Sequence, residues 1–154
     1  AGYGRVGHIL GRTLDADGIP FLALDTNSNG VAHARSQGKP VYYGDASRLE
    51  MLRRAHAETA RVLVLTMDDA EAAEHVVRAV HSEIPQLPII ARARDADHAS
   101  LLYSLGAQEV ILETVEASLQ LAGRTLQLVG TQEDIILRRI DTQRQIELET
   151  IHHS

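Results

Sequence analysis

The segment Gly2-Tyr3-Gly4-Arg5-Val6-Gly7 decides the fold, because its glycines have the spacing G-x-G-x-x-G and it opens a helical pattern that continues to Leu14. In this spacing the first glycine permits a tight turn and the second lets phosphate groups approach backbone N–H groups. The third allows a helix to pack closely on a strand. The segment therefore predicts a phosphate-binding turn between a strand and a helix.

An acidic residue follows this turn at the distance that such sites use. The apolar run from Phe21 to Leu24 ends at Asp25, about 20 residues after the glycines, where a carboxylate binds ribose hydroxyls. The alternative is that Asp25 caps the next helix. A carboxylate here favours a free ribose diol, so NAD, NADH, AMP or ATP fit better than NADP. We include Thr26, the next residue, in the expected site.

Short β-rich runs alternate with helical stretches along the chain. The expected strands are Phe21–Leu24, Val41–Tyr43, Arg61–Leu65, Ile89–Ala93 and Glu109–Leu112, and the expected helices lie near Val6–Asp15, Asn27–Gln37, Ser47–Ala55, Asp69–Ile84 and Asp95–Leu105. Runs such as Val62 to Leu65 are apolar on both faces, which is typical of parallel strands covered by helices. The pattern predicts an α/β fold, a Rossmann-like doubly wound parallel sheet with helices on both faces.

The start of the sequence is short for this fold. A strand of several apolar residues normally precedes the glycine-rich turn, and only Ala1 stands before Gly2. A central strand cannot be absent without exposing the backbone groups of its neighbours. We expect that the first strand is truncated and that the sequence starts part-way through a longer polypeptide.

The pattern changes after Leu112. One long helical segment runs to Gly130, and the charged stretch 131–154 carries apolar residues such as Ile136, Ile140 and Ile151. We predict a nucleotide-binding domain over residues 1–130 and a C-terminal helical arm or tail over residues 131–154. The arm either packs on its own domain or makes a dimer or partner contact.

Two further segments follow predicted strands at the carboxyl edge of the sheet, where open α/β sheets bind ligands. Asp45 and Ala46 come after Val41–Tyr43, and Asp45 is expected either to meet an adenine amino group or to cap the helix that starts near Ser47. Thr66 and Met67 come after Arg61–Leu65 and are expected to flank the nucleotide.

Composition excludes several classes of function. The 154 residues have a net charge of −6, 3% aromatic residues and no cysteine, which disfavours nucleic-acid binding and excludes disulfides, thiolate metal sites and a cysteine nucleophile. The histidines have no metal-site spacing and none pairs with a serine nucleophile, so we predict no metal and no catalytic residue. The apolar runs fall far short of the roughly 20 residues that span a bilayer.

Several motifs together resemble the regulatory domain called RCK-N, KTN or TrkA-N, and the version here looks closest to the Kef-type potassium-efflux antiporters. The matching segments are Gly2 to Gly7, Leu24-Asp25, Gly44-Asp45-Ala46-Ser47, Ala91-Arg92-Ala93-Arg94-Asp95 with His98, and Leu105-Gly106-Ala107. The resemblance covers about residues 1–130. It implies a homodimeric domain on the cytoplasmic side of the inner (cell) membrane that binds NAD(H) or AMP and gates ion transport through a membrane transporter module.

The resemblance also assigns residues. It places phosphate contacts on Tyr3, Gly4, Arg5 and Val6, ribose on Asp25, and the base near Asp45 and Ala46. In the glutathione-gated branch of the family it makes Arg92 or Arg94 the nearest candidates for a glutathione-type ligand. A guanidinium at a strand end suits a phosphate or carboxylate, whereas the alternative for either arginine is a surface ion pair with Asp95 or Asp97.

The leading hypothesis is therefore a sensor domain and not an enzyme. A dehydrogenase needs a proton donor and a substrate pocket, which a second domain commonly supplies. In this chain the predicted nucleotide-binding fold leaves too few residues for such a domain. The alternative is the cofactor-binding domain of a small NAD-dependent oxidoreductase.

Overall fold

The computed structural model describes residues 2–153, which form five strands, seven α-helices and one 3-10 helix. The strands are β1 (Ala23–Asp25), β2 (Val41–Tyr43), β3 (Leu63–Leu65), β4 (Ile89–Ala93) and β5 (Glu109–Leu112). The helices are α1 (Arg5–Ala16), α2 (Ser28–Ser36), α3 (Leu49–Arg54), η1 (Ala57–Thr59), α4 (Ala70–Glu83), α5 (Ala96–Leu105), α6 (Glu113–Leu128) and α7 (Glu133–His152). Strand and helix alternate as far as β5, as predicted.

The strands pair in parallel and form two small sheets. One sheet has the order β1-β2, with Ala23 opposite Val41, and the other has the order β3-β4-β5. Parallel pairing requires a crossover between successive strands, and α2, α4 and α5 supply these connections. The Rossmann-like α/β fold predicted from the sequence is confirmed.

Gly2 links the two sheets. Its N–H donates to the carbonyl oxygen of Leu24 in β1 at 2.7 Å, and its carbonyl oxygen accepts from Thr66 Oγ1, just beyond β3, at 2.5 Å. The glycine-rich turn thus begins between β1 and β3. The strand expected ahead of this turn falls on Ala1, which lies outside the described residues.

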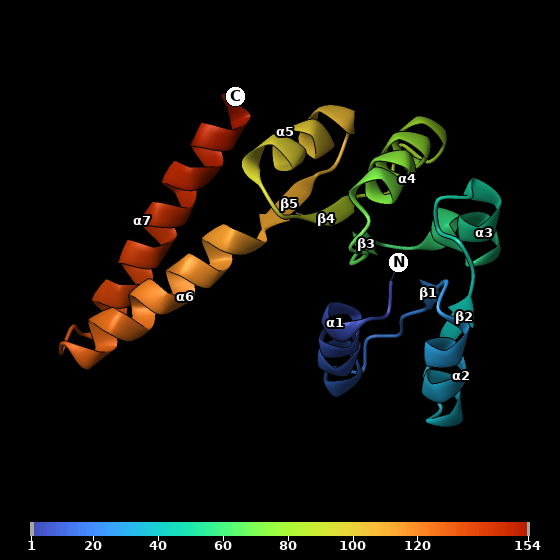
Figure 1. The fold of residues 1–154 in the computed structure, drawn as a ribbon, viewed down its shortest axis with the longest axis horizontal. Helices are drawn as coiled ribbons and strands as arrows, with labels where there is room; N and C mark the ends of the chain where they lie inside the picture. Colours follow the sequence, from blue (N-terminus) through green and yellow to red (C-terminus); the bar gives the residue numbers. More distant parts are fainter. Residues whose placement is uncertain (1, 154) are drawn as a thin grey trace.

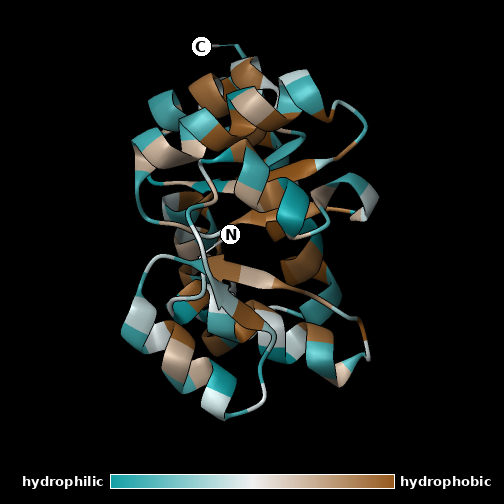
Figure 2. Ribbon diagram, turned by 90° about the vertical axis from the view of Figure 1, so that its right-hand side faces the viewer, coloured by the Kyte–Doolittle hydropathy of each residue, from teal (hydrophilic) through white to brown (hydrophobic). Residues whose placement is uncertain are grey.

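Helices lie on both sides of the strands. Helices α1 and α2 lie on one side, and α4 and α5 lie on the other (Figure 1). Hydrophobic residues gather in the strands between these layers (Figure 2). A large core joins β3, β4 and β5 to α4 and α5, with Leu65, Val77, Ile89 and Leu102 almost fully buried. A smaller core under the glycine-rich turn contains Tyr3, Ala23, Val31, Ala34 and Val41.

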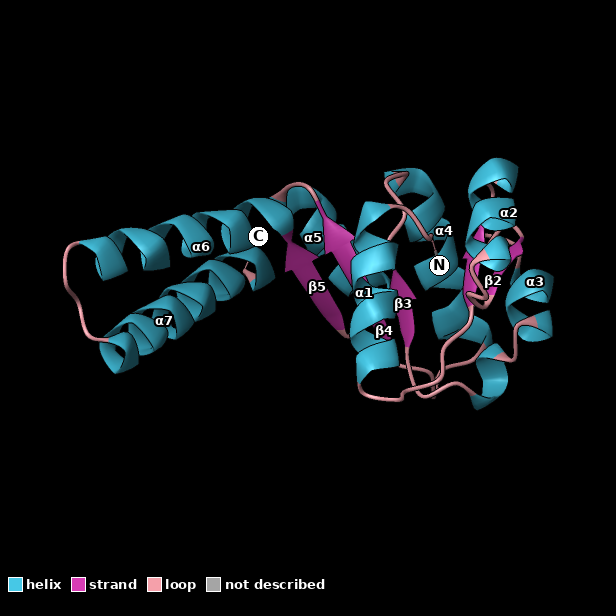
Figure 3. Cartoon of the chain, turned by 90° about the horizontal axis from the view of Figure 1, so that it is seen from below, coloured by secondary structure: helices cyan, strands magenta, loops and turns pink. Residues whose placement is uncertain are grey.

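Helices α6 and α7 form a hairpin that projects beyond β5 (Figure 3). Gly123 of α6 allows the close approach, because a Cβ there would lie 2.7 Å from Ile140 Cδ1 of α7. Arg144 of α7 donates from Nε to Glu116 of α6 at 2.8 Å, and this bond raises the pKa of Arg144. Ile151 near the end of α7 is buried in the large core. The helix expected in the tail is present, and the domain boundary at residue 130 stays a prediction.

Several elements differ from their predicted bounds. Strand β1 is shifted from the expected Phe21–Leu24, and β3 is shorter than Arg61–Leu65. Helix α3 begins at Leu49 instead of Ser47, because Asp45 holds a turn in which its backbone oxygen accepts from the N–H of Arg48. Among residues 2–153 no helix is both long and apolar enough to span a bilayer.

Candidate functional site

A cavity of about 910 Å³ opens at the carboxyl ends of β1 to β4, where the two sheets meet. It is lined by Gly2, Gly4, Arg5, Val6, Leu24, Asp25, Thr26, Gly44, Asp45, Ala46, Ser47, Thr66, Met67, Asp68, Asp69, Glu71, Ala72, His75 and Arg92. Its size lies in the range of small-molecule and cofactor sites. All the residues predicted for the site line it except Tyr3 and Gly7.

The glycine-rich turn leaves open space at its second glycine. A Cβ added at Gly4 would meet nothing within 4 Å. Gly4 is also the N-cap of α1, with no side-chain cap bond, so the first N–H groups of this helix have no partner within it. An anion over Gly4 would meet these N–H groups and the positive end of the helix dipole. The residues present therefore fit a phosphate.

The other two glycines are held by close packing. Gly2 has φ +97°, and a Cβ there would lie 2.9 Å from both Met67 N and Thr66 Oγ1. A Cβ at Gly7 would lie 2.5 Å from the carbonyl oxygen of Gly2. Gly7 is buried and lies under the turn, which explains why it does not line the cavity.

The side chain of Tyr3 points into the smaller core and does not line the cavity. It is 7% exposed, and its ring lies 4.2 Å from the ring of His8 and 6.4 Å from that of Phe21, centroid to centroid. A phosphate contact through this side chain has no support in the geometry.

Asp25 holds the glycine-rich turn. Its Oδ2 accepts from the backbone N–H of Tyr3 at 2.7 Å, and its Oδ1 accepts from that of Asn27 at 2.9 Å. Helix α2 is capped by Asn27, whose Oδ1 accepts from the N–H of Gly30. The interpretation of Asp25 as a helix cap is therefore wrong. Each carboxylate oxygen keeps a second lone pair, and Asp25 lines the cavity at the end of β1.

Asp45 also organises backbone at the cavity wall. Its Oδ1 accepts from the N–H of Ser47 at 2.9 Å and from the Ser47 hydroxyl at 2.6 Å. These hydrogen bonds lower the pKa of Asp45, because they favour the charged carboxylate. Helix α3 has Arg48 at its N-cap and no side-chain cap bond, so the predicted capping role of Asp45 is wrong.

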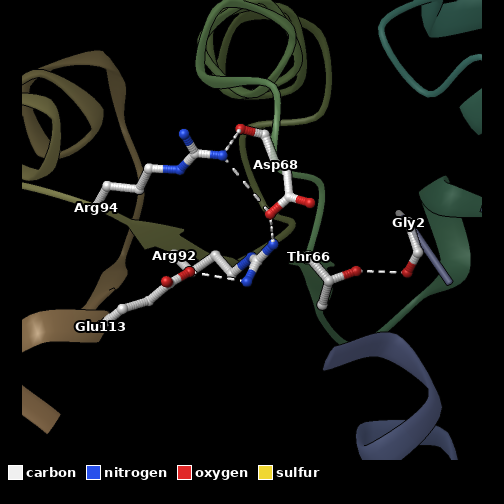
Figure 4. A network of polar contacts seen from close by, with 6 residues as sticks. All are labelled: Gly2, Thr66, Asp68, Arg92, Arg94 and Glu113. Carbon is white, nitrogen blue, oxygen red and sulfur yellow. Dashed lines mark hydrogen bonds and ion pairs between the residues drawn. The ribbon is translucent and has the colours of Figure 1, made fainter. Parts of the chain in front are cut away.

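Arg92 at the end of β4 lies in an ion-pair network (Figure 4). Its Nη1 donates to Glu113 Oε1 at 2.8 Å and its Nη2 donates to Asp68. Arg94 lies farther from the same carboxylate, with Nη2 3.9 Å from Asp68 Oδ1. The alternative for these arginines, a surface ion pair with Asp95 or Asp97, is wrong, because both arginines pair with Asp68. Asp95 instead caps α5 by accepting from the N–H of His98 at 2.8 Å.

One part of the cavity wall was not predicted from the sequence. Between β3 and the second turn of α4 it is formed by Asp68, Asp69, Glu71, Ala72 and His75. The sequence signal for this wall was the Asp68-Asp69 pair directly after a strand, where a helix begins. Asp69 caps α4 by accepting from the N–H of Ala72 at 3.0 Å. Glu71 and His75 are four residues apart, a spacing that places them on one helix face. Leu24, Gly44 and Ser47 also line the cavity; they belong to the matching segments but were not named as site residues.

Within the described part of the chain, residues 2–153, no group of three His, Asp or Glu side chains lies close enough to hold a metal ion.

Together these observations define a class of protein: a Rossmann-like α/β domain whose glycine-rich turn opens on a cavity at the carboxyl edge of its sheets. Within that class the chain belongs to the TrkA-N domain family, because the model of that family matches residues 1–113.

Individual relatives cover nearly the whole chain. KefC of Klebsiella pneumoniae, a glutathione-regulated potassium-efflux system protein, is 36% identical over 151 residues, which are 98% of this chain and 24% of KefC. The chain thus spans about a quarter of the length of this relative. A structure of the Shewanella denitrificans Kef CTD in AMP-bound form has a TM-score of 0.83 and 33% identity, covering 99% of this chain and 93% of that chain.

A more distant solved structure is the GsuK channel bound to NAD. It has a TM-score of 0.72 and 25% identity, and the match covers 80% of this chain and 22% of that channel.

Proposed function

We propose that this chain is the nucleotide-binding regulatory domain of a Kef-type potassium-efflux antiporter. Support comes from its likeness to KefC over 98% of its length and to a Kef CTD that binds AMP. The observation that carries the proposal is the open space over Gly4 at the N-terminus of α1, with Asp25 at the end of the neighbouring strand.

The proposed ligand is AMP or NAD(H). Its phosphate lies over the turn, against the backbone N–H groups of Gly4, Arg5 and Val6, where the dipole of α1 favours an anion. The ribose lies at Asp25, whose oxygens accept hydroxyl donors in addition to the two backbone N–H groups. The base lies near Asp45 and Ala46. Thr26, Thr66, Met67 and Arg92 line the rest of the site.

The proposed assembly is a homodimer attached to a membrane transporter module on the cytoplasmic side of the inner membrane. Large apolar side chains on the α6–α7 hairpin support a partner contact, since Leu121, Leu128 and Leu137 are 71%, 88% and 62% exposed. Exposed apolar groups in such numbers are characteristic of association surfaces. Nucleotide binding then gates transport to the extent that it favours one arrangement of the dimer over another.

A glutathione-type ligand remains a prediction of the family resemblance. Its candidates, Arg92 and Arg94, both lie against Asp68, so an incoming carboxylate would have to displace that side chain.

Calorimetric titration of the 154-residue chain with AMP and with NADH tests the nucleotide site. We expect binding by the wild-type chain and at least a tenfold loss of affinity in Gly4→Asp, which places a carboxylate where the phosphate lies, and in Asp25→Ala. Gly30→Asp is a matched control, because it adds the same charge in the first turn of another helix, at a glycine without a positive φ and outside the cavity. Unchanged affinity in both site variants would contradict the assignment.

The alternative function, a cofactor domain of an NAD-dependent oxidoreductase, is tested by the parent reading frame. Several upstream segments of roughly 20 apolar residues support the transporter, whereas a catalytic domain supports the oxidoreductase.

A further inference from the structure

Arg92 connects the wall of the cavity to helix α6. Asp68, which accepts from its Nη2, lines the cavity between β3 and α4. Glu113, which accepts from its Nη1 at 2.8 Å, is the first residue of α6. A single guanidinium therefore joins the cavity to the helix that begins the α6–α7 hairpin (Figure 4).

The two carboxylates and the guanidinium differ in exposure. The Arg92 side chain is 17% exposed, whereas those of Asp68 and Glu113 are 77% and 44% exposed. Pairs with exposed carboxylates are weak, because water competes with them. Arg92 Nε is buried and has no hydrogen-bond partner among residues 2–153. A ligand oxygen that reaches the guanidinium therefore meets the Nη groups, which Glu113 and Asp68 already hold.

The position of Arg92 in the cavity determines which ligands reach it. Asp25, Thr26 and Asp45 line the part of the cavity beside β1 and β2, whereas Arg92 lies with Asp68 at β3 and β4. A mononucleotide with its ribose at Asp25 and its phosphate over Gly4 ends at the glycine-rich turn. A dinucleotide continues beyond the turn, and its second phosphate and second ribose carry oxygen acceptors into the part that holds Arg92.

We propose that Arg92 is a positioning residue that couples the second half of a dinucleotide to helix α6. Ligand oxygens compete with Asp68 and Glu113 for the guanidinium, so occupancy of this part of the cavity loosens the first turn of α6. A mononucleotide leaves the pair with Glu113 in place. This inference rests on the proposed function, because it requires that the cavity binds nucleotides.

Hydrogen exchange on the 154-residue chain tests the coupling. With saturating NADH we expect the amides of residues 116–119, the first that bond within α6, to exchange at least about threefold faster than without ligand, whereas saturating AMP leaves them unchanged. In Glu113→Gln the same amides exchange at one rate with and without NADH. The variant also binds NADH about fivefold or more tightly than wild type, the lower end of typical coupling between sites, and binds AMP within about twofold of wild type.

Glu116→Gln is the matched control. Glu116 lies in the same first turn of α6 but pairs with Arg144 of α7 and does not line the cavity. This variant should keep the wild-type response to NADH, which separates coupling through Arg92 from a general loosening of α6.

The coupling is contradicted if NADH saturates the wild-type chain without changing exchange at residues 116–119, or if the two Glu→Gln variants change NADH affinity equally. In either case nucleotide binding, and with it the proposed function, stands. If neither nucleotide binds the wild-type chain, both proposals fail.

Discussion

The two halves of the cavity are built in different ways. Beside β1 and β2, Asp25 and Asp45 accept hydrogen bonds mainly from backbone N–H groups near the turns that they hold. Beside β3 and β4, Asp68 and Arg92 are held by other side chains, and Glu113 comes from a third element. The turns of the first half are held by the backbone, whereas the second half is a network of ion pairs between a largely buried guanidinium and more exposed carboxylates.

This difference teaches which part of the site is preformed and which part responds. Backbone turns fixed by carboxylates keep their geometry when a ligand arrives, as preorganised sites require. Ion pairs between side chains rearrange at little cost. We therefore assign recognition of the nucleotide to the half at β1 and β2, and signalling to the half at β3 and β4.

The largest expected effect comes from a substitution under the glycine-rich turn, beside β1 and β2. In Gly7→Ala the new Cβ would lie 2.5 Å from the carbonyl oxygen of Gly2, so α1 must move away from the turn. We expect the free energy of unfolding to fall by about 1–3 kcal/mol and AMP affinity to fall at least tenfold, measured by urea denaturation and calorimetry. Gly4→Ala meets no atom within 4 Å and should cost less than about 1 kcal/mol. Equal destabilisation in the two variants would contradict this geometry.

A pair of isosteric substitutions compares the two halves directly. Asp25→Asn removes one of two carboxylate acceptors and should cost about 1–2 kcal/mol, because a backbone N–H loses its partner. Asp68→Asn changes a side chain that is 77% exposed, and its cost should stay within about 0.5 kcal/mol. Urea denaturation of both variants gives the comparison, and a larger loss in Asp68→Asn would reverse the assignment of the halves.

The salt dependence of stability compares the two halves of the cavity again, and its expected effect is smaller. Raising NaCl from about 0.05 to 0.5 M screens exposed charges. Any loss of stability in Asp68→Asn at low salt should therefore disappear at high salt, whereas the loss of stability in Asp25→Asn should persist. Melting curves at the two salt concentrations measure this, and a parallel loss of both effects would show that Asp25 also acts mainly through its charge.

The smallest expected effect is a pH dependence at Asp45. Because its pKa in the folded chain is lowered from the ordinary 3.8, ionised Asp45 stabilises the fold above that pH, and this contribution is lost as pH falls through the lower folded value. The melting temperature of wild type should exceed that of Asp45→Asn by under about 2 °C at pH 6. The gap should narrow below about pH 4, and a gap that widens on acidification would contradict the shift.

The half at β1 and β2 was predictable from sequence because its signals are local. The glycine spacing, Asp25 at a strand end and Asp45 after the next strand each place a residue by its neighbours in the chain. The network at β3 and β4 was not, since Arg92 pairs with residues 24 and 21 positions away. Only the tertiary fold brings these side chains together.

Two further side chains also take places that their sequence motifs do not specify. An ion pair with an arginine was one alternative for Asp95, which caps α5 instead, because a carboxylate before a helix finds backbone N–H groups nearer than a guanidinium. The ring of Tyr3 fills the smaller core, a placement that depends on burial and that no motif specifies, and the phosphate contact assigned to Tyr3 stays a prediction. The alternation of strands and helices was correct, since it depends on hydrophobic periodicity along the whole chain.

The central claim, that the glycine-rich turn and the strand ends beside it bind a nucleotide, is tested most directly by titrating the ¹⁵N-labelled chain with AMP and following its amide resonances. We predict saturable binding with the largest shifts at Gly4, Arg5 and Val6, smaller shifts at Thr26, Asp45 and Ala46, and none along the exposed face of α7. Saturation with the amides of Gly4 to Val6 unmoved, or the absence of any saturable shift at millimolar AMP, would contradict the claim.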